Sequence, residues 1–558
     1  MAVFPAASLA GVTWSSPVVI AHDAELEASA TGSDGRVAVV FGVQDGAVDF
    51  GGVRSSVGLG LFVAGPDGGI AGPVLLSSSA TANEPAVAIG AGRPVVAWLD
   101  QGAAAGQRSV WVWDSLSSIT PGAQQLSANG VSPAVAADDK GDVVVAWVDG
   151  SSREVMASWS IAGGAFGAPE VVSPGESTEY SPVATMDAQG TATIAWQAEG
   201  PAGTQPGGTS SPLGLVMAAS ADPGKPFTAP VTALTGPSGA LVHDLSIQSE
   251  SSGPVLVDAT IMSMPSWSDP SGSPEMTYAT ADPGGAFTPQ LQLSSSPSNF
   301  ESSAGWATTN GGALEAQAAN DAGGNGELST TQIAPGGAIA TSAPFQFTPP
   351  DFGSVFSLAP GLDSNGDAIV PFTTFSTMQP GSFGNPTAGS ILSVVEPAGS
   401  DSWCPAQTVS GLMSPFFPIA AGFGPGDHGV LIYQQTPWGE LAAAYLTPQT
   451  GCGPAAGAIP IEVASSASAS RTLRSASIAA TCIASGGCKG KLVLLDSSAR
   501  TLASGGIAAP DRGSELVQLR LTSLGRRTLR QHRRIHAKVQ LVTGRDHRDL
   551  RQITLTRS

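Results

Sequence analysis

The phrase EPAVAIGAGRPVVAW at residues 84–98 returns as SPAVAADDKGDVVVAW at 132–147 and as SPVATMDAQGTATIAW at 181–196. Each copy ends in a tryptophan, and Trp98, Trp147 and Trp196 are separated by 49 residues. Self-similarity at such a period is typical of propellers, solenoids and arrays. The repeat therefore predicts a row of equal structural units, and it says nothing yet about function.

Each unit reads as four short antiparallel strands. Two apolar runs joined by a Gly-containing turn predict a hairpin, and a third strand such as EVMASWS (154–160) follows. A fourth follows Phe-x-x-Pro, as in FGAPEVVS (166–173). Four such strands describe a propeller blade. Weaker copies, which bring the total to eight, begin at 25, 245, 303, 356 and 417. The copies at 245 and 303 lack the tryptophan, so a seven-bladed propeller remains the alternative.

The two ends of the series complement each other. GVTWSSPVVIA (11–21) is a strand with no unit before it, and ELAAAYLT (440–447) has no fourth strand behind it. We therefore expect the N-terminal strand to complete the last blade, which also removes two exposed sheet edges. The predicted domains are a disordered N-terminus (1–10), an all-β propeller (11–450), a linker (451–474) and a small basic β-sandwich (475–558).

The charge divides at the same boundary. Of 24 Lys and Arg residues, 17 lie in 471–558 beside five acids, so this segment is +12 while the rest of the chain is −32. Such asymmetry indicates two domains with different partners. Within the basic domain, TSLGRRTLRQHRRI (522–535) predicts a short helix capped by Thr522 or Ser523. An anionic cell-wall polymer, nucleic acid and the acidic propeller are the candidate partners of 471–558, beside a merely solvated surface. Nucleic acid is disfavoured because 471–558 contains no aromatic residue for base stacking.

Targeting signals are sparse. No apolar run reaches the roughly 18–20 residues that span a bilayer, so no membrane span is expected. The N-terminus MAVFPAASLAG lacks the basic and apolar regions of a signal peptide. The scarcity of Lys and the abundance of Ser, Thr and Gly nevertheless favour an extracellular or cell-surface protein. A cytoplasmic propeller is the alternative, and a monomer is expected in both cases.

Two motifs carry a family resemblance. The strand GDVVVAW (141–147) follows Gly-x-x-Val-x-Ala-Trp, and FGAP (166–169) follows Phe-x-x-Pro. Over about residues 11–450 the chain resembles sialidase-like (BNR-type) propellers, and more closely the secreted propeller proteins of actinobacteria. The resemblance implies the fold and no activity. The Asp-box Ser-x-Asp-x-Gly-x-x-Trp is not met, and all five propeller arginines precede residue 154, which argues against the arginine triad of a sialidase.

The resemblance extends to the C-terminal domain. The same proteins carry domains in which a Cys-x5-Cys element, here Cys482 and Cys488, precedes a Gly-x-Leu-x-Leu strand. We predict a local disulfide between Cys482 and Cys488, and a second one between Cys404 and Cys452 across the last two blades. Zinc is the disfavoured alternative because the chain has no Cys-x-x-Cys pair and its six His residues are scattered.

Binding residues are predicted on the face that carries the loops between second and third strands. Three of these loops, 197–213, 260–275 and 373–389, are long and rich in Pro and Gly. Insertions on one face of a repeat protein often mark its binding side. Trp267 in the second loop is a candidate platform for stacking a sugar or peptide, unless it packs against its own loop.

Acids recur where each first strand begins, and they predict an acidic ring around the channel mouth. The members are Glu25, Glu84, Glu179 beside Tyr180, Asp244 beside His243, Glu301 beside Phe300, and Asp351 beside Phe352. The ring can bind a cation, a basic peptide or sugar hydroxyls, and Glu179, Glu301 and Asp244 are the candidates for a glycosidase acid/base pair. The alternative is a set of solvated turn acids.

A weak metal motif and the overall functional prediction complete the picture. Asp363, Asn365 and Asp367 have the spacing of a calcium loop, although an ordinary hairpin turn fits better. No cofactor is expected.

The sequence favours a noncatalytic exported binding protein whose propeller face recognises a glycan or peptide and whose tail attaches to an anionic surface. A carbohydrate-active hydrolase or lyase using paired carboxylates and a structural repeat scaffold are the alternatives.

Overall fold

The computed structural model describes residues 10–557 except 16, 23, 49–53, 103–107, 116–121, 175–181, 199–202, 205–209, 212, 239, 250–254, 264–273, 283, 296–300, 304–312, 321–325, 334–338, 343–344, 348–354, 363–366, 375–388, 398–402, 405, 414–418, 425–427, 436–439, 451–460, 464–465, 483–487, 497, 510–513 and 544–545. The described residues are almost entirely β-structure. Among them no helix is both long and apolar enough to cross a bilayer.

Between residues 10 and 450 the described strands form eight antiparallel sheets of four or five strands, which we number along the chain. Sheet 1 contains β3 (Ala24–Thr31), β4 (Val37–Val48), β5 (Arg54–Ala64) and β6 (Ile70–Ser77). Sheet 2 contains β7 (Ala82–Gly90), β8 (Arg93–Gln101), β9 (Arg108–Asp114) and β10 (Ala123–Ser127). Sheet 3 contains β11 (Gly130–Ala137), β12 (Val143–Asp149), β13 (Val155–Ser160) and β14 (Glu170–Val171). Sheet 4 contains β15 (Val183–Met186), β16 (Ala192–Ala198), β19 (Leu213–Ala221) and β20 (Val231–Ser238).

The second half repeats this order. Sheet 5 contains β21 (Ala240–Ser249), β22 (Val255–Ser263), β23 (Pro274–Ala281) and β24 (Leu291–Ser295). Sheet 6 contains β25 (Glu301–Ser303), β26 (Ala313–Asn320), β27 (Gly326–Ile333), β28 (Ile339–Thr341) and β29 (Phe345–Phe347). Sheet 7 contains β30 (Val355–Leu358), β31 (Gly361–Leu362), β32 (Ala368–Thr374), β33 (Gly389–Glu396) and β34 (Gln407–Met413). Sheet 8 contains β35 (Ala420–Gly424), β36 (His428–Gln435) and β37 (Glu440–Thr450), with β1 (Ala10–Trp14) and β2 (Val18–Ala21) beside β37. A small ribbon of β17 (Gly203–Thr204) and β18 (Ser210–Ser211) lies in the first of the three long loops.

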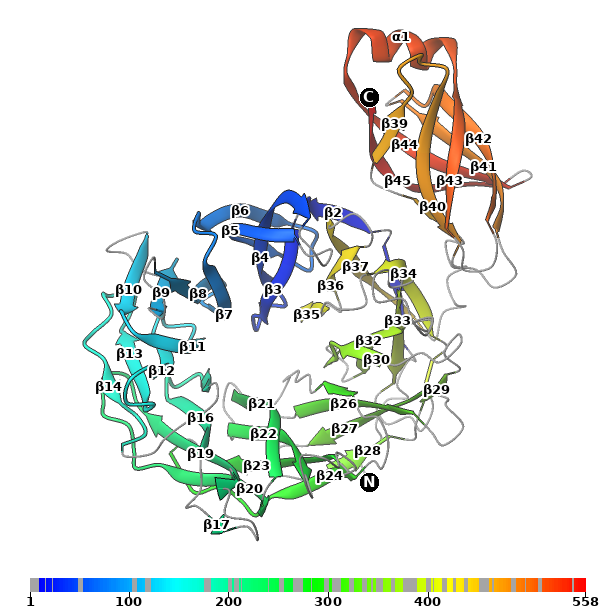
Figure 1. The fold of residues 1–558 in the computed structure, drawn as a ribbon. Helices are drawn as coiled ribbons and strands as arrows, with labels where there is room; N and C mark the ends of the chain where they lie inside the picture. Colours follow the sequence, from blue (N-terminus) through cyan, green and yellow to red (C-terminus); the bar gives the residue numbers. More distant parts are fainter. Residues whose placement is uncertain are drawn as a thin grey trace.

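The sheets stand around a ring with their first strands toward its centre (Figure 1). Along the first half of the ring β3 contacts β7, β7 contacts β11, β11 contacts β15, and β15 contacts β21. On the other side β35 of sheet 8 contacts β3 of sheet 1. Because strands alternate in direction, the turns joining first to second strands share one face, the turn face. The opposite face, where the first strands begin, is the entry face.

The repeated tryptophans fill the spaces between neighbouring sheets. Trp98, Trp147 and Trp196 are at most 2% exposed. Trp147 packs with Val95, Ala97 and Leu99 of the preceding sheet, and Trp196 packs in the same way against sheet 3. The second strands read as continuous apolar runs because both of their faces are covered by other sheets. The 49-residue repeat therefore reflects the packing of each of these tryptophans against the preceding sheet.

Truncating one of these tryptophans should loosen one junction. We expect Trp147→Ala to lower the free energy of unfolding by about 3–5 kcal/mol, because a large buried side chain leaves a cavity. Trp111 on β9 is only partly buried, so Trp111→Ala is the matched control with a smaller loss. Denaturant titration measures both, and equal losses would contradict the packing role of Trp147.

The N-terminal strands join the last sheet. β1 pairs antiparallel with β37 from Ala10↔Thr450 to Trp14↔Leu446, and β2 pairs with the same strand further along. At the neighbouring turn, a Cβ on Gly35 would lie 2.4 Å from the Cα of Gly424, so sheets 1 and 8 approach through backbone alone. Gly35 also has a φ of +77°, which favours glycine.

The C-terminal strands form one sheet. It contains β38 (Ile461–Val463), β39 (Ser466–Ala469), β40 (Ser475–Cys482), β41 (Cys488–Leu495), β42 (Thr501–Ala509), β43 (Ser514–Leu521), β44 (Arg534–Thr543) and β45 (Asp546–Arg557). β40 also pairs with β43, so the sheet closes on itself around one apolar core. This differs from the expected sandwich of two separate sheets, because β40 bonds strands on both of its edges. β38 and β39 come from the segment predicted as a linker.

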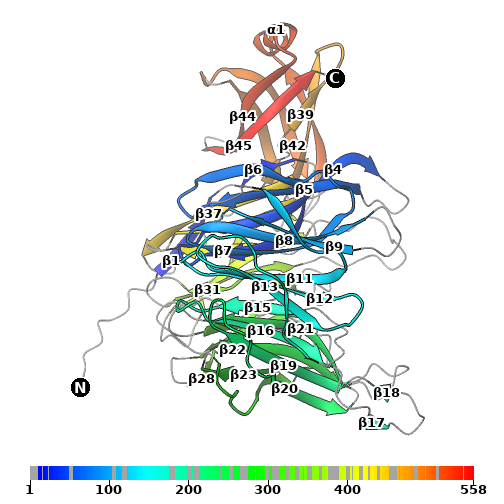
Figure 2. The same ribbon diagram turned by 90° about the vertical axis from the view of Figure 1, so that its left-hand side faces the viewer.

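The one helix of the described chain lies at the end of this domain farthest from the ring (Figure 2). α1 (Ser523–Gln531) begins after Thr522, whose hydroxyl accepts the Gly525 N–H at 3.1 Å. This is the predicted N-cap, which satisfies one backbone donor of the first turn. Leu529 is buried against the closed sheet, while Arg527 and Arg530 are exposed.

Two of the four cysteines fall on described side chains. Cys404 and Cys488 are each 4% exposed, and the described residues include no free cysteine. The predicted partners, Cys452 and the side chain of Cys482, lie outside the described part of the molecule. The two pairings therefore stay predictions.

Candidate functional site

A β-bulge recurs at the same rung of the first strands. In β7 the residues Glu84 and Pro85 lie opposite the single residue Trp98, because the register shifts between Asn83↔Leu99 and Ala86↔Ala97. The corresponding two-against-one shifts occur in β11 and β21. Nearby irregularities lie in β30, where the bulge faces Thr373, one residue beyond the tryptophan counterpart, and in β3, which has one extra residue. Bulges re-aim side chains and are common at the rims of closed sheets and beside active sites. The entry face therefore carries a repeated structural irregularity opposite the position of the repeated tryptophan.

Two bulge residues have a strained backbone. Glu84 has a φ of +46° and Ser132, at the same place in β11, has a φ of +51°. Residues other than glycine adopt such angles at a cost of about 1–3 kcal/mol and only where the surroundings enforce them. The Glu84 side chain is exposed. The fold thus holds a carboxylate outward on the entry face.

Two members of the predicted acidic ring lie at bulge positions on this face. Glu84 and Asp244 occupy equivalent bulge positions in sheets 2 and 5, whereas Ser132 occupies the position in sheet 3. Glu25 is half-buried in β3 opposite Gly42. The backbones of His243, Asp244 and Glu301 lie in β21 and β25, with side chains outside the described set. Also outside it are Glu179, Tyr180, Trp267, Phe300, Asp351 and Phe352, so their roles stay predictions.

A histidine–carboxylate pair on the entry face was not anticipated. His22 Nδ1 lies 3.1 Å from Glu440 Oε1, and the side chain of Glu440 is 6% exposed while that of His22 is 67% exposed. The pairing Ala21↔Leu441 places the two residues side by side although 418 positions separate them. Gln434 and Gln435 are buried near the end of β36, beside this pair in the sheet. No local sequence signal could have joined residues so far apart.

Glu27, on β3 of sheet 1, is a carboxyl with a raised pKa. Loss of hydration raises the pKa of Glu27, and the neighbouring Glu25 carboxylate raises it further. Glu27 is the extra residue of the β3 bulge, between Leu26 and Ala28. A carboxyl with a raised pKa is a better proton donor near neutral pH than an ordinary one. Sheets 8 and 1 therefore contribute a histidine–carboxylate pair and a carboxyl with a raised pKa.

The turn face carries a second acidic feature, in the hairpin of sheet 3. Asp138 Oδ1 accepts the N–H groups of Lys140 at 2.9 Å and Asp142 at 2.8 Å. Asp138 is 5% exposed, and burial raises its pKa, with the Asp142 carboxylate adding to the effect. This pair organises the turn: Asp142 Oδ1 accepts the N–H of Ala162 at 2.7 Å.

Neighbouring turns are linked to one another on this face. Ala91 donates its N–H to Asp139 at 2.9 Å, and Lys140 Nζ donates to the carbonyl of Gln189 at 2.6 Å. Arg36 reaches the carbonyl of Gly92 at 3.3 Å. Sheets 1 to 4 are therefore joined by polar contacts as well as by their apolar junctions.

The raised pKa of Asp138 sets a pH dependence with a defined sign. Because the folded state holds the Asp138 proton more tightly than the unfolded state, the associated stability is fully present below the ordinary Asp pKa and is lost as pH rises through the folded pKa. Asp138→Asn keeps the Oδ1 acceptor and removes the charge. We therefore expect the variant to gain stability relative to the original protein between about pH 3 and about pH 7.

Denaturant titrations of both proteins across this range measure the difference. Other carboxylates cancel in the comparison because the two proteins share them. A difference that does not change with pH would contradict the assignment.

The metal prediction falls largely outside the described residues. Asp363 and Asn365 are not described, and Asp367 is 3% exposed next to β32. Within the described ranges no group of three or more His, Cys, Asp or Glu side chains is arranged to hold a metal ion. The calcium-loop motif is therefore not extended by any neighbouring described ligand.

Comparisons with known proteins assign no family. No family model matches the chain, and none of the curated proteins matches it. Among solved structures, the polysaccharide lyase Uly1 superposes with a TM-score of 0.40 at 10% identity over 67% of this chain and 90% of that one. An ulvan lyase of family PL25 gives 0.38 at 10% identity over 74% and 96%. The fucose-specific lectin from Aleuria aurantia gives 0.30 at 13% identity over 58% and 97%. At these values the similarities indicate neither an activity nor a ligand.

Proposed function

We propose that the chain is a noncatalytic, exported binding protein in which the entry face of the ring recognises a glycan or a peptide. The observation that carries the proposal is the bulge that recurs opposite the tryptophan position. It repeats in sheets whose entry-face residues differ: Glu84 in one, Ser132 in the next, Asp244 in another. A backbone bulge that is repeated with different side chains suits recognition of one extended ligand by several different groups.

The proposal includes an eight-bladed propeller closed by the N-terminal strands. Its support is the pairing of β1 and β2 with β37 and the contact of β35 with β3. Closure gives the entry face a continuous rim, which an open array of the same sheets would lack.

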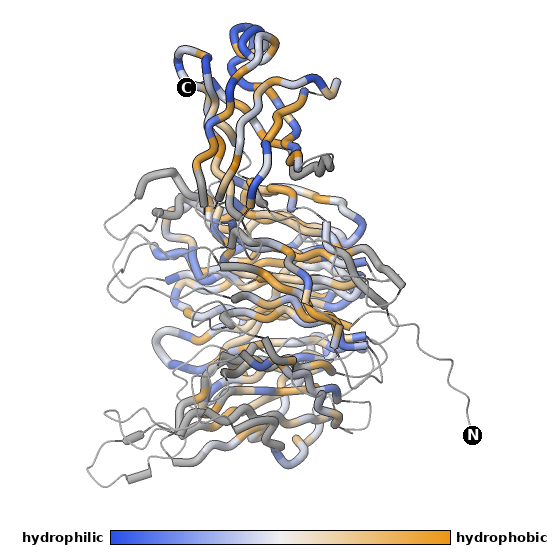
Figure 3. The backbone as a smooth tube through the Cα atoms, turned by 90° about the vertical axis from the view of Figure 1, so that its right-hand side faces the viewer, coloured by the Kyte–Doolittle hydropathy of each residue, from blue (hydrophilic) through white to orange (hydrophobic). Residues whose placement is uncertain are grey.

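The basic C-terminal domain supplies the second part of the proposal, attachment to an anionic surface such as a cell-wall polymer. Exposed basic side chains gather on and after α1, at the end remote from the ring, which Figure 3 shows as strongly hydrophilic. They are Arg527, Arg530, Arg533, Arg534, His536 and Lys538. This placement would let the domain hold a surface while the entry face stays accessible.

The entry-face proposal is tested with a variant designed to keep the fold. Glu84→Gly removes the carboxylate and suits the positive φ, so we expect stability to be unchanged or higher by about 0.5–1 kcal/mol. Combined with Asp244→Asn, it should weaken by at least tenfold any glycan or peptide that an array screen of the original protein identifies, about 1.4 kcal/mol. Asp67→Asn removes one carboxylate charge from the exposed β5–β6 turn on the opposite face and is the control for Glu84→Gly alone, which also removes one.

Two outcomes would overturn the proposal in different ways. If no array component binds, the chain is a structural scaffold. If the original protein releases reducing or unsaturated sugar and the release stops in Glu179→Gln, Glu301→Gln or Glu440→Gln, it is a hydrolase or lyase.

Surface attachment is tested by charge removal in the full chain. We expect the triple variant Arg527→Gln, Arg530→Gln, Arg534→Gln to bind an anionic cell-wall polymer more weakly and with a shallower dependence on salt, because fewer counterions are released. Arg500→Gln is the matched control, since Arg500 is paired with Asp496 at 2.7 Å and holds the pKa of that carboxyl below its usual range. Sedimentation with purified wall polymer measures both. An equal loss of polymer binding in the two variants, or no loss of binding in either, would contradict the proposed attachment.

A further inference from the structure

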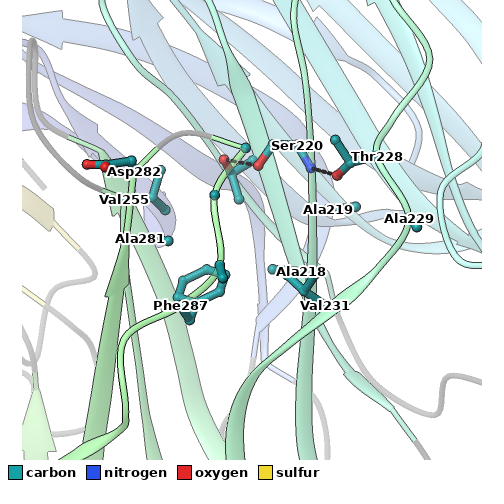
Figure 4. Close-up of a pocket in the computed structure, with 14 residues that line it drawn as sticks. Ala218, Ala219, Ser220, Thr228, Ala229, Val231, Val255, Ala281, Asp282 and Phe287 are labelled. Atoms are coloured by element: carbon teal, nitrogen blue, oxygen red, sulfur yellow. Dashed lines mark hydrogen bonds between the residues drawn. The ribbon is translucent and has the colours of Figure 1, made fainter.

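A pocket opens on the turn face between sheets 4 and 5 (Figure 4). It encloses about 470 Å³ including its open mouth. Phe287 lies on one side, and Ala218 and Val231 lie on the other. Ser220 and Thr228 form the polar end: the Ser220 hydroxyl is 2.8 Å from that of Thr193, and Thr228 Oγ1 accepts the Ser220 N–H at 3.1 Å. The other lining residues are Asp282 and several alanine, valine and glycine residues.

The preceding junction, between sheets 3 and 4, has the same construction. Trp147 and Trp196 are equivalent by the repeat, and their partners Met156 and Met217 fix the register of β13 against β19. In this register Trp159 corresponds to Ser220. The outer loops agree, because the N–H of Gly167 bonds the carbonyl of Trp159 at 2.8 Å, and the N–H of Thr228 bonds that of Ser220 at 2.9 Å.

The two junctions differ in what fills them. Between sheets 3 and 4 the indole of Trp159 stacks on Phe227, with ring centroids 6.0 Å apart and an interplanar angle of 28°. Between sheets 4 and 5 the ring corresponding to Phe227 is Phe287, since both follow the same Gly turn and begin the same loop bridge. Facing Phe287, however, is a serine instead of a tryptophan. The pocket beside Phe287 therefore corresponds to the space that the Trp159 indole fills beside Phe227 in the preceding junction.

The rest of the wall also favours an aromatic occupant. Ala157 pairs with Glu170 in sheet 3, and its counterpart Ala218 pairs with Val231 in sheet 4, so the pocket presents an apolar side chain where the filled junction has an acid. An aromatic ring stacked on another gains about 0.5–1.5 kcal/mol beyond the burial of its area. Phe287 is only partly buried and so offers such a face.

The charges around the pocket indicate which substituent a bound aromatic ring should carry. Asp282 borders the pocket and is exposed, and Asp222 stands at the corresponding place in the neighbouring loop. Lys225 lies in that loop but does not line the pocket. The segment before residue 471 carries a net charge of −32. These charges complement a cation at the open end of the pocket.

We infer that the pocket between sheets 4 and 5 is a binding site for a small aromatic amine, whose ring occupies the space that Trp159 fills in the preceding junction and whose ammonium group faces Asp282. The site is on the face opposite to the one proposed for glycan or peptide recognition, so the two inferences stand or fall separately.

Tryptamine is the probe, titrated into the full-length protein by calorimetry. We expect one equivalent to bind. The double variant Thr193→Val, Ser220→Trp installs the Val144 and Trp159 pair of the filled junction, with no unpartnered hydroxyl left at Thr193. This variant should fold as stably as the original protein and lose binding at least tenfold. Phe287→Leu keeps an apolar side chain, removes the stacking face and should also weaken binding.

The converse variant and a charge comparison complete the test. Trp159→Ala opens the equivalent space beside Phe227 and should raise the number of bound tryptamine molecules from one to two. Indole-3-acetate, with the same ring and opposite charge, should bind at least tenfold more weakly than tryptamine. Absence of tryptamine binding to the original protein, unchanged binding in the filled variant, or equal affinity for the two probes would each overturn the inference.

Discussion

Burial of apolar side chains between neighbouring sheets is the constraint on which the ring depends. A sheet of four short strands cannot cover its own faces, so each must lie against two others. Trp98, Trp147 and Trp196 fill three successive junctions, and the apolar second strands around them have no solvent-facing side. The turn-to-turn hydrogen bonds and the bulges of the entry face are arranged around this packing. These hydrogen bonds and bulges modify the two faces of the ring, whereas the apolar packing between sheets holds the ring together.

Because the junctions between sheets share one construction, a residue that differs from its counterparts gives its junction a local chemical group or space that the others lack. Replacing a stacked tryptophan by serine leaves a pocket beside Phe287, and replacing a small bulge residue by Glu84 places a carboxylate on the entry face. Both changes are local, and the remaining junctions still hold the sheets in place. A repeat scaffold can therefore vary local groups with few consequences elsewhere. The sites proposed for this protein lie where its repeats disagree.

The sequence predicted some of these features and could not have predicted others. The repeat period anticipated the sheets, and the Thr522 cap anticipated α1, because both are recorded in residues close together in the chain. The acid positions were identified from the beginning of each unit, but the bulge that Glu84, Ser132 and Asp244 share depends on strand register. His22 and Glu440 meet only through the pairing of β2 with β37. The closed sheet of the C-terminal domain likewise depends on a β40–β43 pairing that alternating polarity alone cannot specify.

The pairing of both chain ends in sheet 8 has a consequence for how the protein folds. Sheets 1 to 7 are each built from consecutive residues, so they can form in order as the chain is made. Sheet 8 needs β1 and β2 together with β37, and these are more than 400 residues apart. Closing so long a loop adds an entropic cost that local hairpins do not meet. Sheet 8 is therefore expected to form later than the others, and the contact between His22 and Glu440 requires that β2 has paired with β37.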